Sequence, residues 1–291
     1  YKRQTLALIE ETANNITDSA DCAIGFEAAH MVLAGLQGCR DDYVYHIEHG
    51  KCSYSITQPV PCVALCPAGV DIPGYIALVG EERYADAVSL IRKDNPFPTA
   101  CALICEHPCE ARCRRNMIDS SVNIRGLKRM AVDNAPANTV PVPPKAPSTG
   151  KRIAIAGGGP GGLSAAYYLE LMGHHAVVFE QKSQLGGMLR YGIPNYRFPR
   201  ERLDEDIEAI LSTGVEVHTN ANIGNGENDI PLSRLREDFD AVYIAIGAHT
   251  DKKIGMEGED AQGVISAVEM LRNIGDGNPP DFTGKRVIVV G

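Results

Sequence analysis

The sequence predicts an α/β dinucleotide-binding domain of the Rossmann type, preceded by an all-α domain. A glycine-rich turn at 157–162 lies between an apolar run and a helical pattern, as in a βαβ unit. All nine cysteines lie between Cys22 and Cys113, where short helical segments alternate with turns. At 291 residues the chain is long enough for about two domains.

Composition narrows the classes of partner. The formal net charge is -9 and basic residues do not cluster, which argues against nucleic acid or an anionic membrane as the main partner. No apolar stretch approaches the roughly 18 residues that span a bilayer. Because the chain starts at Tyr1 and stops at Gly291 within an apolar run, we expect both ends to be cut, so a targeting peptide is not visible.

The first half of the chain has helical periodicity. Apolar residues spaced three to four apart predict two helices within 1–51. In 52–135, short helices at 72–79 and 84–92 alternate with cysteine-bearing turns, which predicts a small α-helical domain. Residues 136–149 are rich in proline and poor in side chains that can pack, so we expect an extended linker there.

Strands and helices alternate beyond the linker. Apolar runs at 152–156 and 176–180 flank a helical pattern at 163–172, and together they predict a βαβ unit. The alternation continues, and we expect one α/β domain over 150–284. Its later elements are predicted as a helix at 205–211 and strands at 215–218 and 241–246.

The glycine turn matches the dinucleotide-binding fingerprint. Gly157 permits the tight turn, Gly159 lets the backbone approach a pyrophosphate, and Gly162 lets helix and strand pack closely. The N-terminus of the helix then faces the anion. Glu180 ends the second strand at the distance expected for a ribose-binding carboxylate. The alternative interpretation is a tight βα turn that binds nothing.

Two further segments favour FAD as the ligand. Glycines 186 and 187 follow the second strand closely, and the segment 245–247 ends a buried strand where backbone can again approach a cofactor. The cofactor-binding residues predicted from these patterns are Gly157, Gly159, Pro160, Gly161, Gly162, Glu180, Gly186, Gly187, Ala245 and Gly247.

Six thiols are concentrated in about fifty residues. Thiolates are soft ligands for iron–sulfur clusters, and in a long chain this spacing indicates a reducing compartment, which we take as the cytoplasm. The alternatives are a zinc site, or small core side chains along a helix, although Pro108 would interrupt such a helix. The six are Cys62, Cys66, Cys101, Cys105, Cys109 and Cys113.

Several strings make 62–291 resemble the small subunit of glutamate synthase and the matching part of dihydropyrimidine dehydrogenase. They are Cys66-Pro-Ala-Gly-Val-Asp-Ile-Pro, Asn95-Pro-Phe-Pro, Pro108-Cys-Glu-Ala-Arg-Cys, Ile124-Arg-Gly-Leu-Lys-Arg and Gly186-Gly-Met-Leu-Arg-Tyr-Gly-Ile-Pro. The resemblance implies an NAD(P)H domain that begins in 285–291. It also implies that FAD contacts the glycine turn, Glu180, Gly187, Met188, Arg197 and Ile223.

The resemblance further implies two [4Fe–4S] clusters, of which we expect one with a second possible. It assigns Cys62 and Cys113 to one cluster, and assigns to the other Cys66, Cys105 and Cys109. The family's cysteine pair before this region is absent, which leaves Cys52. Lys128 replaces a glutamine or glutamate ligand, and an ammonium group does not ligate iron. Cys101 can substitute for a missing ligand, and His107 is expected to be exposed or hydrogen-bonded rather than a ligand.

Residues 9–52 resemble the C-terminal helices of the NADH-oxidising flavoprotein subunit of respiratory complex I. The resemblance implies that Cys22 is the fourth ligand of a [4Fe–4S] cluster whose other ligands precede Tyr1. The alternative is a buried cysteine in a helical hairpin. Cys39 has no counterpart and is expected in the core.

These patterns predict an iron–sulfur flavoprotein module. NAD(P)H would exchange a hydride with FAD, and single electrons would pass through clusters to a partner subunit, in an electron-bifurcating complex. No side chain is predicted as acid or base. No cysteine follows Cys113, so the flavin lacks the redox-active pair of disulfide reductases. The alternatives are a glutamate synthase small subunit and a non-enzymatic, zinc-stabilised scaffold.

Overall fold

The computed structural model describes residues 2–49 and 60–290, in two compact units, Tyr1–Val60 and Pro61–Gly291. Cys52, one of the predicted metal ligands, lies outside the described residues. In the described part of the chain, no helix has both the length and the apolar character needed to cross a bilayer.

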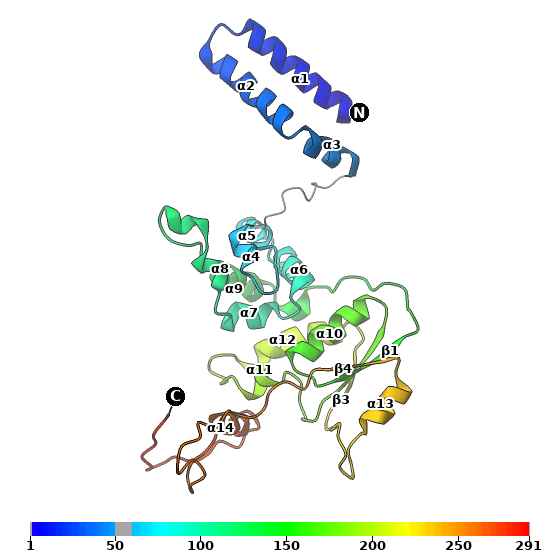
Figure 1. Cartoon of the computed structure of the whole chain (residues 1–291), viewed down its shortest axis with the longest axis vertical. Coiled ribbons are helices and arrows are strands. Elements are labelled where there is room, and N and C mark those ends of the chain that lie inside the picture. Colours follow the sequence, from blue (N-terminus) through cyan, green and yellow to red (C-terminus); the bar gives the residue numbers. More distant parts are fainter. Residues whose placement is uncertain (1, 50–59, 291) are drawn as a thin grey trace. The chain divides into compact units, whose positions relative to one another are not determined.

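The first unit consists of three helices, α1 (Lys2–Ser19), α2 (Ala23–Gly38) and α3 (Arg40–His49) (Figure 1). The sequence predicts only two helices here. The third has only two aliphatic side chains, Val44 and Ile47, too few to show helical periodicity, and none of its residues is buried. Where α1 packs against α2, the buried side chains are Ala13, Ala29, Leu33 and Leu36.

Short helices open the second unit: α4 (Pro61–Ala64), α5 (Ile72–Gly80), α6 (Tyr84–Asp94), α7 (Pro98–Ile104), α8 (Pro108–Ala111), the 3-10 helix η1 (Arg114–Met117) and α9 (Ile124–Asn134). Asp71 and Asn123 cap α5 and α9, because each carboxylate or amide oxygen accepts a backbone N–H three residues on. Pro98 and Pro108 begin α7 and α8, where a missing N–H costs nothing. The second cysteine run is therefore divided between two helices and the turns beside them.

The proline-rich linker contains one short 3-10 helix, η2 (Ala137–Thr139), and is bonded to both sides of the second unit. The buried guanidinium of Arg92 donates to the carbonyl oxygen of Val140 at 2.8 Å. Further along, the ammonium of Lys145 lies 2.5 Å from the buried carboxylate of Glu170. Beyond η2 the linker forms no helix or strand, and it is held in place at several points.

Four parallel strands form one sheet in the order β3-β2-β1-β4. Ile153 lies in register with Ala176 on one side and Ala241 on the other. Because all strands are parallel, their carboxyl ends share one edge of the sheet. The strands and the helices between and after them are β1 (Arg152–Ala156), α10 (Pro160–Leu171), β2 (His175–Phe179), α11 (Met188–Tyr191), α12 (Arg200–Leu211), β3 (Glu216–His218), α13 (Leu232–Asp238), β4 (Ala241–Ile244) and α14 (Ala267–Gly275).

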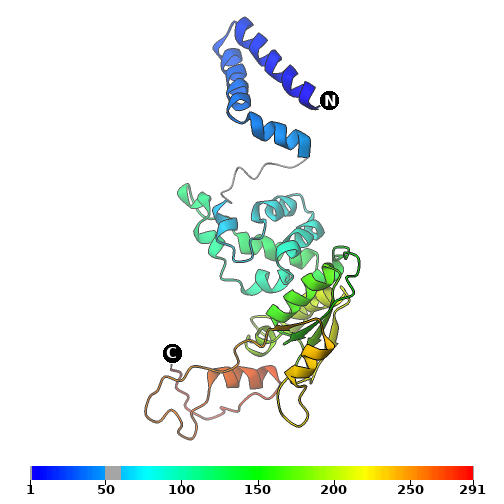
Figure 2. The same ribbon diagram turned by 45° about the vertical axis from the view of Figure 1, so that its right-hand side comes forward.

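Helices cover both faces of this sheet (Figure 2). On one face α10 and α12 pack in a core that includes Ile155, Leu163 and Leu203, and on the other α13 contributes Leu235. The first core also takes in Phe97 and Ala100, at the start of α7. A parallel sheet with helices on both faces, preceded by an all-α region, confirms the predicted fold class.

Some predicted boundaries are wrong. The helix after the glycine turn begins at Pro160, not at residue 163, because proline suits the first turn of a helix. The apolar run 287–290 forms no strand in the described structure and is exposed. An isolated strand has no neighbour to accept its backbone hydrogen bonds, so an apolar run alone does not make one.

Candidate functional site

The glycine turn joins β1 to α10 at the carboxyl edge of the sheet. Gly157 has a φ of +110°, and an added Cβ would collide with the carbonyl oxygen of Ala245. A Cβ on Gly162 would collide with the carbonyl oxygen of Gly157. Both positions therefore require glycine, and the close helix–strand approach predicted for the fingerprint is present.

Glu180 lies directly beneath this turn. Its carboxylate accepts the backbone N–H of Gly158 at 2.7 Å and that of Lys182 at 2.8 Å. Its side chain is buried, so these two donors replace water around the charge. The acidic residue and the turn form one hydrogen-bonded unit, which fits the carboxylate expected to bind ribose hydroxyls.

The loop that follows β2 is bonded to the turn. The N–H of Gly186 donates to the carbonyl oxygen of Gly158 at 2.8 Å. Two buried or half-buried arginines shape this loop: Arg190 donates to the carbonyl oxygen of Leu185 at 2.6 Å, and Arg200 to that of Ile193 at 2.7 Å. The sequence interpretation did not include either arginine among the site residues.

The remaining predicted flavin contacts divide into two groups. Ala245 lies next to the turn, because its N–H donates to the carbonyl oxygen of Ala156 at 2.8 Å, and Gly247 follows with φ +68°. Met188 begins α11, one residue after the glycine pair. Ile223 packs against the core between the sheet and α13, two residues after Ala221, whose N–H donates to the carbonyl oxygen of Glu180 at 2.9 Å.

Three of the predicted ligand cysteines meet around one apolar core in the helical region. Cys109 is buried there, and Cys62 and Cys66 pack against the same residues. Burial raises the pKa of the Cys109 thiol, the charge of Lys128 lowers it, and the neighbouring Cys105 and Cys66 raise it. These thiols therefore lie within electrostatic reach of one another.

Tyr75 lies among the same thiols. Burial raises the pKa of its hydroxyl, and Cys109, Cys66 and Cys62, in that order, raise it further. The hydroxyl donates to the carbonyl oxygen of Ile124 at 3.1 Å, which fixes the ring. No sequence signal identified this tyrosine as part of the site.

Cys101, in α7, and Cys105, the residue after α7, accept hydrogen bonds at sulfur. Asn95 donates from Nδ2 to the Sγ of Cys101 at 2.9 Å, and burial raises the pKa of that thiol. The N–H of His107 points to the Sγ of Cys105 at 3.3 Å. His107 itself has a φ of +44° and lies 3.2 Å from the carboxylate of Glu110, as expected for a hydrogen-bonded histidine.

Lys128 is buried, with 7% of its surface exposed, and has no carboxylate partner among the described residues. Its ammonium lies 5.6 Å from the centroid of the Tyr75 ring, and its charge lowers the pKa of both Cys101 and Cys109. A buried cation without a carboxylate partner is unfavourable unless negative charge lies nearby. The thiolates of a bound cluster would supply that charge.

The thiols are close but not arranged as a finished metal site. Within 2–49 and 60–290, no group of three or more Cys, His, Asp or Glu side chains has metal-binding geometry. The donor set nevertheless fits a [4Fe–4S] cluster, because it consists of several soft thiols around one buried cation and N–H groups directed at sulfur.

The first unit contributes two cysteines to the described part of the chain, Cys22 and Cys39. Cys22 is exposed at the start of α2, so the alternative of a buried cysteine in a hairpin is wrong. Cys39 is also exposed, and its predicted place in the core is wrong. It follows the end of α2, beyond the helix face that is buried.

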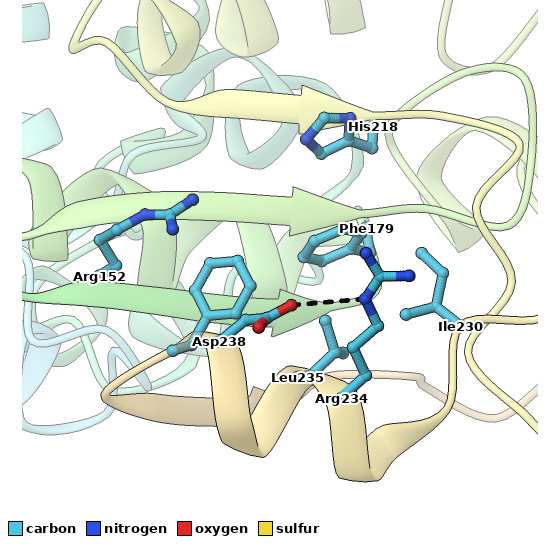
Figure 3. A pocket seen from close by; sticks show the side chains of 8 residues that line it. Arg152, Phe179, His218, Ile230, Arg234, Leu235 and Asp238 are labelled. Carbon is cyan, nitrogen blue, oxygen red and sulfur yellow. Dashed lines mark hydrogen bonds and ion pairs between the residues drawn. The ribbon is translucent and has the colours of Figure 1, made fainter.

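A separate cavity of about 380 Å³ lies between the sheet and α13 (Figure 3). Aromatic side chains and a pair of arginines line it, and none of the predicted site residues does. Arg234 pairs with Asp238 at 3.4 Å, and Arg152 stacks over the ring of Phe239 at 4.7 Å. Its charged groups are therefore already partnered within the protein.

This fold, with a glycine turn at the sheet edge and a cluster of thiols in the helical region, is typical of iron–sulfur flavoprotein oxidoreductases. The family model described as dihydropyrimidine dehydrogenase domain II, 4Fe-4S cluster, matches 45–140, and the pyridine nucleotide-disulphide oxidoreductase family matches 151–291. The chain thus carries a match to a 4Fe–4S domain of the first family, followed by a match to a nucleotide-binding domain of the second.

Curated relatives agree with this assignment. The chain is 38% identical to NADPH-Fe(3+) oxidoreductase subunit beta of Geobacter sulfurreducens over 98% of its own length and 44% of that subunit. It is 38% identical to NADP(+)-dependent formate dehydrogenase subunit beta of Moorella thermoacetica, over 82% and 37%. Identity to the glutamate synthase [NADPH] small chain of Mycobacterium tuberculosis is 34%, over 78% and 48%. The chain therefore spans less than half the length of each of these proteins.

Among solved structures, FprA from Mycobacterium tuberculosis in complex with NADPH aligns with 44% of this chain and 29% of its own. The TM-score is 0.39 and the sequence identity 24%.

Proposed function

We propose that this chain moves electrons between FAD, bound at the glycine turn, and [4Fe–4S] clusters bound by the cysteine region, and exchanges them with a partner subunit. FAD, when bound, would accept a hydride from NAD(P)H, or return one to NAD(P)+, and would pass on electrons one at a time. The nicotinamide would bind to a domain that begins in 285–291. The cofactor contacts and cluster ligands are those named from the sequence.

One observation carries this proposal. The cysteine run 101–113 lies against the segment 180–199 between β2 and α12, which we call the flavin loop. Arg197, a predicted flavin contact, lies 3.8 Å from the carboxylate of Glu106, which is next to Cys105 in sequence. Phe97 and Ala100, on and beside the cysteine helix α7, are part of the core of the α/β domain. Two redox groups bound at these places would be neighbours within one rigid unit.

The residues of the chain position the cofactors and set their environment. The glycine turn and the start of α10 present backbone N–H groups to a pyrophosphate, and Glu180 holds the ribose. Around the thiols, N–H groups directed at sulfur and the charge of Lys128 favour the reduced form of a cluster. No side chain needs to transfer a proton.

The test is an anaerobic preparation in which FAD, iron and sulfide are measured per chain. We expect flavin bands above a broad brown absorbance that bleaches with dithionite, and a cluster signal in electron paramagnetic resonance. Flash photoreduction of the flavin should then be followed by reduction of the cluster. A colourless protein, or one that contains zinc in place of iron, would falsify the proposal in favour of the scaffold.

A matched pair of variants assigns the cluster to the cysteine region. Cys109→Ser removes a buried thiol at the centre of the predicted ligands, whereas Cys39→Ser removes an exposed thiol in the other unit. Iron content should fall in the first variant and stay unchanged in the second. Equal iron content in both would show that the cluster lies elsewhere.

The partner follows from the relatives rather than from a site. Proteins at 38% identity carry the names of beta subunits, and one of them aligns with 98% of this chain, including its first unit. The glutamate synthase small chain aligns with 78%. We therefore favour a multisubunit oxidoreductase, with electron bifurcation as one form of it, over glutamate synthesis. Co-purification of a second subunit that accepts electrons from the reduced chain would test this choice.

A further inference from the structure

Asp206 is a buried carboxylate on α12, and both its partners belong to a different domain. Its two oxygens accept the backbone N–H groups of Thr99 and Ala100, at 3.1 and 2.8 Å, in the first turn of α7. The residue has no exposed surface. Burial raises the pKa of this carboxyl to about 7, an effect that the two N–H donors oppose.

Burial of the Asp206 carboxylate lowers the stability of the fold, so packing alone does not explain its presence. No arginine or lysine makes an ion pair with Asp206 among the described residues, and Arg92 acts on it only at longer range. An apolar residue would fill the same space without loss of hydration. An apolar residue would not fix the position of α7 along α12. The two N–H bonds that converge on Asp206 do so, because they determine where α7 begins relative to α12.

The same helix α12 also organises the flavin loop. Arg200, at its start, donates to the carbonyl oxygens of Leu189, Phe198 and Ile193. One turn on, Asp204 pairs with the buried Arg190. Within seven residues, then, α12 bonds first to the loop predicted to contact FAD and next, through Asp206, to the helix that leads to Cys105.

We propose that Asp206 is a positioning residue for electron transfer: through the start of α7 it fixes the cysteine ligands at a set distance from the flavin loop. This inference rests on the proposed function. The carboxylate contacts neither cofactor. Its effect is to turn α12 into a rigid connection between the two redox groups, at a point where packing of Phe97 and Ala100 alone would permit sliding.

The variant Asp206→Asn tests this connection. Asparagine has the same shape but only one acceptor oxygen, so its NH₂ would face the N–H of one residue of α7. The matched control is Asn138→Ala, which removes an exposed hydrogen bond of 2.8 Å to Glu208 on the same helix. The readout is the rate constant for cluster reduction after flash photoreduction of the flavin, with FAD and iron content measured in each sample.

We expect Asp206→Asn to keep both cofactors and to slow this step several-fold, because the rate of electron transfer falls exponentially with the distance between the two redox groups. The control should leave the rate unchanged. A variant with full cofactor content and the normal rate would refute the role of Asp206. So would an equal loss in the control.

Hydrogen exchange on the unmodified chain gives an independent arm. The amides of Thr99 and Ala100 should be protected as strongly as those in the middle of α12, since a helix otherwise leaves its first N–H groups unbonded. This measurement also applies if Asp206→Asn does not fold. It applies as well if the unmodified chain shows no flavin-to-cluster transfer, a result that would refute the proposed function. Free exchange at both amides would overturn the inference.

Discussion

The glycine turn and the cysteine region differ in how much of each site the protein forms by itself. At the turn, the N–H of Gly158 already donates to the carboxylate of Glu180, and its carbonyl oxygen accepts the N–H of Gly186. In the cysteine region, an apolar core gathers the thiols, but in the described residues no three ligand-type side chains have metal-binding geometry. One site is built from backbone and the other from side chains whose final arrangement a metal would determine.

The difference follows from the two kinds of ligand. A phosphate is bound by N–H groups whose directions the βα turn fixes as it folds. A cluster is bound by thiolates, which repel one another until iron neutralises their charge. We therefore expect substitutions at the turn to act on folding and binding together, and changes in the cysteine region to depend on whether iron is present.

The largest effect is expected at Gly162. Gly162→Ala places a Cβ against the carbonyl oxygen of Gly157, a backbone atom that cannot move without opening the turn. We expect a loss of about 3 kcal/mol of stability, and of FAD binding, because α10 must shift from β1. Urea unfolding and flavin content measure both. Gly80→Ala is the control: Gly80 ends α5, away from the predicted flavin contacts, and its Cβ would meet nothing within 4 Å. Equal losses of stability and flavin content in the two variants would mean that the contact with Gly157 is not what requires glycine at 162.

The sequence was sufficient to predict this part of the molecule. The fingerprint glycines, the acidic end of β2 and the parallel βαβ unit each leave a local pattern, because a short stretch of backbone performs the task. The same holds for α5, predicted at 72–79, whose cap is formed by Asp71 immediately before it. Residues such as Gly157 need no distant partner to be recognised.

Sites made by distant contacts were not predictable in the same way. Asp206 bonds to residues more than one hundred positions earlier, and Tyr75 to Ile124, so no window of sequence contains both partners. The third helix of the first unit has no buried residue, and the exposure of Cys39 depends on where α2 ends. In these cases tertiary packing, not local pattern, decides.

A second prediction concerns removal of iron. Treatment with a chelator and dithionite should speed amide exchange over 62–113. The free energy of local opening should fall there by about 1–3 kcal/mol, because bound metal stabilises only the state that binds it. Protection in β1 and β2 should stay within error. Exchange measured by mass spectrometry before and after treatment gives both values. An equal increase in amide exchange in β1 and β2 would mean that iron stabilises the whole unit and not the cysteine region alone.

Replacement of Lys128 should have opposite effects with and without the cluster. Lys128→Met removes a buried ammonium that has no carboxylate partner, so the iron-free protein should gain about 1 kcal/mol in its free energy of unfolding. In the loaded protein, loss of the positive charge should lower the reduction potential of the cluster by on the order of 50 mV.

The control for Lys128 is its neighbour on α9. Arg129→Met removes an exposed cation that pairs with Asp133 at 3.2 Å, and we expect little change in either quantity. Thermal unfolding of the iron-free chain and potentiometric titration of the loaded chain are the measurements. A higher potential in Lys128→Met would mean that this cation does not face the cluster.

The smallest effect is expected where the two regions meet, at Arg197 and Glu106. Their ion pair spans 3.8 Å between exposed side chains, and such pairs contribute about 0.2–1 kcal/mol. Single and double alanine variants should therefore give a coupling in unfolding free energy below about 0.5 kcal/mol, and 1 M salt should abolish it. FAD affinity provides the sharper comparison. If Arg197 contacts the flavin, Arg197→Ala weakens FAD binding while Glu106→Ala does not; equal weakening would mean that the arginine acts only through its ion pair. The outcome decides whether the contact between the regions is a cofactor-binding element or a surface pair that happens to lie beside one.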